Sequence, residues 1–167
     1  MIFRAHADGR FYLASRIVKC AVGRAGVIRA DLKSEGDGAS PLGIWPIRRV
    51  LYRADRFWPP STRLRLDPIL PDDGWCDAVG DQAYNRPVKL PYPASCEQLW
   101  RDDAVYDLVV VLGHNDDPPR HGAGSAIFLH LARPNFEPTQ GCIALARPDL
   151  LELLSLAGPD SALEIAL

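Results

Sequence analysis

The sequence predicts a mainly β protein of one domain, a barrel or sandwich with two short helices. Short apolar, β-prone segments recur along the chain, and turn residues rich in glycine and proline separate them. Only two segments carry the start signals of a helix. The 167 residues, taken as one domain over 1–167, are enough for a sizeable core.

The chain begins with a predicted β-hairpin. Residues 11–22 alternate well enough for one strand, 23–26 (GRAG) form a tight turn, and Ile28, Ala30 and Leu32 share a face of the returning strand. A glycine-rich loop, 33–43, precedes a third strand from Ile44 to Arg53. Because this loop lacks a P-loop lysine pattern and a following helix, we reject phosphate binding.

Residues 59–93 form a proline-rich excursion with seven of the fifteen prolines. Such density excludes long helices and central strands, while the aromatic residues argue against a disordered linker. We expect an ordered, irregular segment that walls one side of a cleft. Trp75 and Arg86 are its candidates for substrate contact, with a solvated surface role for Arg86 as the alternative, and Asp77 is expected to tie down the loop.

The second half alternates buried strands with two predicted helices. A capping box at 95–98 predicts a short helix through Trp100, and 106–113 reads as a strand buried on both faces. Pro148 suits the first turn of a helix that Gly158 ends, followed by a last strand over 161–167. The buried stripe of that helix is leucine: Leu150, Leu151, Leu153 and Leu154.

Residues 125–145, SAIFLHLARPNFEPTQGCIAL, organise the predicted site. The segment 125–131 reads as a buried strand ending near His130, and Pro134, Asn135 and Pro138 predict a reversal before Cys142. If the reversal is centred on Phe136, His130 opposes Cys142 across a β pair. Directly opposed Cβ atoms lie roughly 5 Å apart, so the imidazole would reach the sulfur.

A thiol beside an imidazole is a candidate nucleophile. A free thiol has a pKa of about 8.5, and a nearby imidazole can take its proton. Gly141 allows close backbone approach, so the amides of Gly141 and Cys142 are candidate oxyanion donors. The alternative is an inert core thiol and a core histidine with its hydrogen bonds satisfied.

The sequence of this segment resembles that of the YkuD family, the L,D-transpeptidases of bacterial cell-wall synthesis. The family signature is a histidine on a strand followed by Ser/Thr-x-Gly-Cys, which here is His130 and Thr139-Gln140-Gly141-Cys142. Ser40-Pro41-Leu42-Gly43 also resembles a Thr-Pro-x-Gly element that precedes a strand near the active site. Gln140, Ala144 and the short connection between histidine and cysteine depart from the common pattern, which suggests a divergent branch.

The resemblance implies a YkuD-like barrel or sandwich and acyl transfer on peptidoglycan stem peptides containing diaminopimelate. Cys142 would be the nucleophile, His130 the base and acid, and the Leu131 carbonyl the group that orients His130. Thr139, Gln140 and Arg133 are the matching candidates for substrate contact. Sensitivity to carbapenems is also implied. If water resolves the thioester, the activity is an L,D-carboxypeptidase; a non-catalytic wall-binding module is the third alternative.

The composition limits the kinds of partner that we expect for this chain. The net charge is −2, so no large basic field indicates nucleic acid, and no apolar run is long enough to span a membrane. No signal peptide is visible at the start, whereas the resemblance implies a periplasmic or cell-envelope location. We expect a monomer with no cofactor. We also expect no metal, because His114, His121 and His130 lack a metal-binding spacing.

Four cysteines show no CxxC pair. If Cys142 is the nucleophile, Cys20, Cys76 and Cys96 remain, an odd number that argues against a complete disulfide framework. We expect these three to be small buried or half-buried residues.

Overall fold

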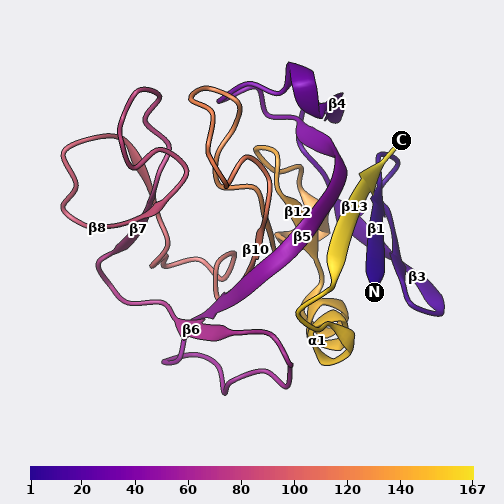
Figure 1. Cartoon of the computed structure of the whole chain (residues 1–167). Coiled ribbons are helices and arrows are strands. Elements are labelled where there is room, and N and C mark those ends of the chain that lie inside the picture. The colour runs from indigo at the N-terminus through magenta and orange to yellow at the C-terminus, as the bar shows by residue number, and fades with distance from the viewer.

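Strand β5 (Ser40–Tyr52) is the longest element, and the barrel closes on it. In the computed structural model, which describes residues 1–167, β5 pairs with β13 through residues 43–46 and with β10 through residues 47–52. The eight strands β10, β11, β12, β3, β2, β1, β13 and β5 therefore form a closed ring (Figure 1). Strands β4 and β6 pair with β5 in parallel.

A second sheet, in the order β8-β7-β9, lies on the opposite side of β10 from β1 and β3 in Figure 1. The remaining strands are β1 (Ile2–His6), β2 (Arg10–Leu13), β3 (Arg16–Ala21), β4 (Val27–Arg29), β6 (Leu66–Pro68), β7 (Asp73–Cys76), β8 (Pro87–Lys89), β9 (Cys96–Gln98), β10 (Leu108–Leu112), β11 (Phe128–Leu131), β12 (Ile143–Leu145) and β13 (Ala162–Ala166). One α-helix, α1 (Arg147–Leu156), and two 3-10 turns, Ala30–Leu32 and Pro134–Phe136, complete the fold.

Two apolar cores explain why β10 is buried on both faces. Its residues 108, 110 and 112 point into the barrel with the leucines of α1, whereas residues 109 and 111 join the second core, which contains Trp75 and Phe128. Strand β11 divides in the same way, because Leu129 and Leu131 face the barrel and Phe128 faces outward. The predicted strand over 106–113 is confirmed as an interior strand, paired on both sides.

The predicted opening hairpin is wrong in its boundaries and partners. Residues 11–22 form two strands, β2 and β3, joined by a turn in which Ala14 has a φ of +48°. The returning strand is only β4, which pairs with β5 in parallel, and 30–32 are a 3-10 turn. The turn between β2 and β3 contains neither glycine nor proline, so the alternation of apolar residues runs through it without a break.

Of the two predicted helices, only the second exists. Residues 96–98 of the predicted capping box form strand β9, which pairs with β7 in the register Cys76↔Cys96. Strand pairing therefore overrides the local helix signal. Helix α1 is confirmed, with Pro148 in its first turn and Leu150, Leu153 and Leu154 buried. Residues 161–167 also form the predicted last strand, β13, between β1 and β5.

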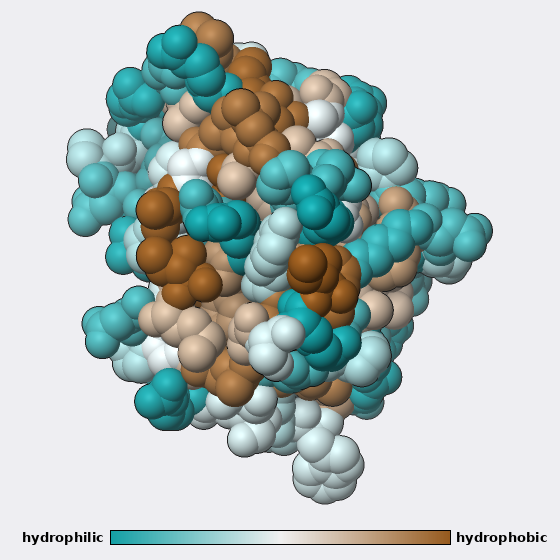
Figure 2. Space-filling view, turned by 90° about the vertical axis from the view of Figure 1, so that its right-hand side faces the viewer, coloured by the Kyte–Doolittle hydropathy of each residue, from teal (hydrophilic) through white to brown (hydrophobic).

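The face that carries β1 and β3 has no single large apolar area. Figure 2 shows that its apolar residues form separate groups between hydrophilic ones. No helix of the chain has the length and apolarity to cross a membrane. The four cysteines are free, and Cys20 and Cys76 are buried and Cys96 half-buried, as predicted.

Candidate active site

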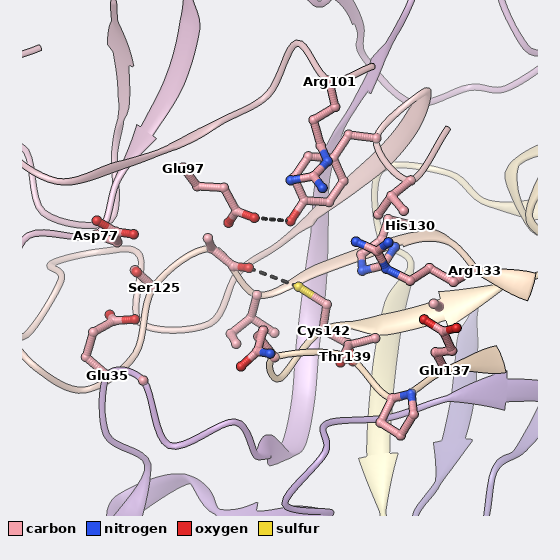
Figure 3. Close-up of a pocket in the computed structure, with 18 of the residues that line it drawn as sticks. Glu35, Asp77, Glu97, Arg101, Ser125, His130, Arg133, Glu137, Thr139 and Cys142 are labelled. Carbon is pink, nitrogen blue, oxygen red and sulfur yellow. Dashed lines mark hydrogen bonds between the residues drawn. The ribbon is translucent and has the colours of Figure 1, made fainter. Parts of the chain in front are cut away.

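A cavity of about 410 Å³ contains both predicted catalytic side chains, His130 and Cys142. It lies on the outer face of the barrel, where β11 and the segment before β12 meet the loops around the small sheet. Its polar lining comes from distant parts of the chain, as Figure 3 shows. Each of the two residues keeps only a small exposed fraction, 6% for His130 and 7% for Cys142.

The strand pairing that brings them together differs from the predicted hairpin. Strands β11 and β12 are parallel, with His130 beside Ala144, because the connection between them crosses over rather than folding straight back. Cys142 lies two residues before Ala144 and therefore faces the same side as His130. Diagonal neighbours on one face of a sheet lie about 7–8 Å apart, with their Cβ atoms somewhat closer, so the imidazole can reach across although the two residues are farther apart than a directly opposed pair.

The sulfur of Cys142 is held by backbone groups near the start of β11. Its Sγ–H donates to the carbonyl oxygen of Ala126 at 3.2 Å, and Sγ accepts from the amide of Phe128 at 3.4 Å. No hydrogen bond joins Sγ to His130, so the resting thiol points toward Ala126 (Figure 3).

Thr139 and Gly141 fix the turn that presents Cys142. Thr139 Oγ1 donates to the Cys142 carbonyl at 2.6 Å and accepts from the Gly141 amide at 3.1 Å. Gly141 has a φ of +128°, and a Cβ there would lie 2.9 Å from the carbonyl oxygen of Ala39. Ser40 at the start of β5 adds a donor to the Cys142 carbonyl at 3.4 Å, so the predicted Ser-Pro-x-Gly element does lie beside the site.

These contacts show which of the two predicted oxyanion donors has a free N–H group. The Gly141 amide is occupied by Thr139, whereas the Cys142 amide makes no hydrogen bond within the protein. Cys142 is therefore the better candidate for the donor, and Gly141 contributes its unusual backbone conformation.

The ring of His130 has one bonded and one free nitrogen. Nδ1 lies 2.9 Å from the carbonyl oxygen of Leu131, so it carries the proton and donates. Nε2 has no hydrogen-bond partner and is left as the basic nitrogen. The ring of Tyr106 packs edge-on against the imidazole, with centroids 5.3 Å apart. The predicted contact with Leu131 is present, and its role in catalysis stays a prediction.

Burial keeps both groups neutral. It lowers the pKa of His130 to about 4, although the Leu131 carbonyl opposes this shift. Burial likewise raises the pKa of the Cys142 thiol to about 12, helped by the negative charge of Glu97. The site thus rests as a thiol beside a neutral imidazole rather than as a thiolate–imidazolium pair.

Three of the five predicted substrate-binding residues line the cavity, and two do not. Thr139, Gln140 and Arg133 belong to its wall. Trp75 is 6% exposed, packs against Phe128 with centroids 5.1 Å apart and donates from Nε1 to Asn85 at 2.9 Å. Trp75 therefore lies in the second core and outside the cavity of His130 and Cys142, and its contact with substrate stays a prediction.

Arg86 also lies outside the cavity of His130 and Cys142. It is exposed and lines a separate, smaller hollow of about 150 Å³ that contains neither His130 nor Cys142. The residue of the excursion that does line the main cavity is Asp77, which the sequence analysis assigned to tying down the loop.

Sequence reasoning missed several polar residues of the cavity. Glu35, Glu97, Arg101 and Ser125 line it with Asp77, and Tyr106 bridges Glu97 and the His130 ring. They come from four segments without a shared motif, so no local signal in one sequence could have grouped them.

Comparison with known protein families gives a match over nearly the whole chain. The model of the L,D-transpeptidase catalytic domain, YkuD, matches residues 5–165, a range that includes every cavity residue named above. No curated protein sequence matches the chain.

Proposed function

The chain belongs to the YkuD family of L,D-transpeptidase catalytic domains, and we propose that it cross-links peptidoglycan stem peptides through a thioester on Cys142. The family acts on peptidoglycan peptides, which is consistent with an envelope location. The observation that carries the proposal for this chain is the shared cavity of Cys142 and His130, in which Nε2 is unprotonated and unbonded.

In the first step, Sγ attacks the carbonyl carbon of diaminopimelate while its proton passes to His130 Nε2. The oxyanion of the tetrahedral intermediate would accept from the free Cys142 amide. The C–N bond to the next residue then breaks, and His130 returns the proton to the leaving amine. A thioester remains on Cys142.

In the second step, the amine of an acceptor stem attacks the thioester carbonyl. His130 takes a proton from that amine and returns it to Sγ as the C–S bond breaks, which restores the resting thiol. The Leu131 carbonyl stabilises the imidazolium that forms in both steps, because Nδ1–H donates to it at 2.9 Å. Attack by water in place of the amine would give the L,D-carboxypeptidase activity.

The test is mass spectrometry of muropeptides incubated with the purified chain. Cross-linking gives a dimer lighter by the leaving residue, trimming gives a shortened monomer, and a binding module leaves the peptides unchanged. Cys142→Ala should abolish both products while the chain still folds, and a carbapenem should add its mass to Cys142 in the unmodified protein. Cys96→Ser, a half-buried cysteine outside the cavity, serves as the control and should keep full activity. Activity retained by Cys142→Ala would refute the assignment.

A further inference from the structure

The cavity has an acidic side that the reaction described above does not use. Asp77, Ser125 and Glu35 lie along one side of it in Figure 3, and Glu97 lies between them and Arg101. Arg133, His130 and Glu137 lie on the other side of Cys142. The two sides therefore offer different groups to a substrate bound over the sulfur.

None of the three carboxylates on the acidic side is in an ion pair, although Arg101 lies on the far side of Glu97. Glu35 accepts from the hydroxyl of Tyr84 at 2.5 Å, and Glu97 accepts from that of Tyr106 at 2.5 Å, but neither they nor Asp77 form an ion pair. Lys33 also lines the cavity, yet its side chain is 2% exposed and its Nζ is bonded to Asp37 and to the carbonyl of Ser34.

Two oxygen atoms on this side are buried and unpartnered. They are Oδ1 of Asp77 and Oγ of Ser125, and the Ser125 residue as a whole is only 7% exposed. Buried polar atoms without a partner cost free energy, so native proteins keep few of them outside functional sites. Both atoms belong to residues of the cavity wall, which indicates a ligand that supplies hydrogen-bond donors there.

A cation with several donors fits this side better than a metal ion. No three acidic or histidine side chains of the chain are close enough together to coordinate one metal. A primary ammonium group, in contrast, offers three N–H donors and a positive charge. Burial raises the pKa of Glu97, and the positive charge of Arg101 opposes this shift only in part, so a further cation would still stabilise the carboxylate.

We propose that Asp77 and Ser125 bind a primary ammonium group of the peptide substrate, with Glu35 and Glu97 adding electrostatic attraction. This inference rests on the proposed function, which supplies two such groups. One is the free amine on the side chain of the donor diaminopimelate, and the other is the acceptor amine. Charge-assisted hydrogen bonds to carboxylates are the strong class, so the loss of this contact should be easily measured.

The donor amine is tested by calorimetry with the full-length Cys142→Ala protein, which cannot turn over. The probes are a stem tetrapeptide with a free side-chain amine and the same peptide acetylated on that amine. If this amine is the ligand, acetylation should weaken binding by about tenfold or more. Asp77→Asn and Ser125→Ala should each reduce that difference, and Asp160→Asn, an exposed acidic residue outside the cavity, should keep it.

The acceptor amine is tested with protein that keeps Cys142, either unsubstituted or carrying one of the test substitutions. This protein is first acylated by the acetylated donor peptide. If the acceptor amine is the ligand, Asp77→Asn should raise the acceptor concentration for half-maximal aminolysis about tenfold or more, and Asp160→Asn should not. Because Asp77 Oδ1 and Ser125 Oγ have no hydrogen-bond partner to lose, Asp77→Asn and Ser125→Ala should unfold at the temperature of the unmodified chain.

Either response supports the ammonium site and identifies its source. If the peptides bind and react but neither acetylation nor the Asp77 and Ser125 variants change affinity or aminolysis, the ammonium site is refuted while the proposed function stands. If neither peptide binds and no thioester forms, the proposed function itself fails, and the ammonium site fails with it.

Discussion

Alkylation of Cys142 by iodoacetamide distinguishes a neutral thiol from a pre-formed thiolate. The thiolate is the species that reacts, and burial raises the pKa of Cys142 to about 12. At pH 7.5 a thiol with the ordinary pKa of about 8.5 is ionised in about one molecule in ten. At a pKa of about 12 the ionised fraction falls to about one in thirty thousand, roughly 3,000-fold less.

The assay is peptide mapping by mass spectrometry after timed alkylation between pH 6 and pH 11. The rate at Cys142 should keep rising throughout this range, about tenfold per pH unit, because the thiol stays largely protonated. His130→Gln should leave this profile unchanged while it abolishes thioester formation, since His130 takes the proton only during attack on a substrate. The half-buried Cys96 in the same sample reports whether the reagent itself behaves normally.

A plateau in the rate at Cys142 below pH 8 would refute this reasoning. It would mean that the thiolate already exists near neutral pH, paired with a protonated imidazole. The plateau should then disappear in His130→Gln, and the resting hydrogen bond from Sγ to Ala126 would not represent the reactive state.

Three further predictions concern the turn and the buried histidine. Gly141→Ala should lose activity and about 1–3 kcal/mol of stability in urea, because of its φ of +128° and the Ala39 carbonyl; Gly26→Ala, also at positive φ but with open space around it, should lose less. Thr139→Val should lower kcat about tenfold or more because Oγ1 holds Gly141 and Cys142, and Thr139→Ser should restore it. The lowered pKa of His130 means that the unfolded chain takes up this proton near pH 6.5 and the folded chain only near pH 4. Stability is therefore lost as the pH falls below about 6.5, by about 2 kcal/mol at pH 5, and urea unfolding should show that His130→Gln lacks this loss. Equal pH dependence in both proteins, a stable active Gly141→Ala, or a Thr139→Val with normal kcat would each contradict the corresponding prediction.

The parts of the fold that the sequence predicted are those with strong local patterns. Strand β10 is a continuous apolar run, and α1 has both a proline at its start and a leucine stripe. The helix predicted at 95–100 failed because its capping-box residues pair with β7, a contact that joins positions some twenty residues apart. Short strands held by non-local pairing leave little trace in the local sequence.

The sequence predicted the cavity residues that lie in or next to the family signature, but not those from other parts of the chain. Thr139, Gln140 and Arg133 adjoin the signature and line the cavity, whereas Trp75 and Arg86 were chosen for their residue types and lie elsewhere. A tryptophan in an irregular, proline-rich segment suits either a binding surface or a core. Here the Trp75 ring fills the second core, between the barrel and the small sheet. It packs against Phe128, which lies far away in the sequence.

The antiparallel prediction for His130 and Cys142 was wrong, yet it placed them on the correct face, and the reason is parity. Both residue numbers are even, and an antiparallel pairing with an even sum keeps even positions on one face. The observed parallel pairing, His130 with Ala144, has an even offset and does the same. The direction of the second strand changes the separation rather than the face. The pair is therefore diagonal instead of opposed, and the resting thiol donates to the carbonyl of Ala126 instead of to the imidazole.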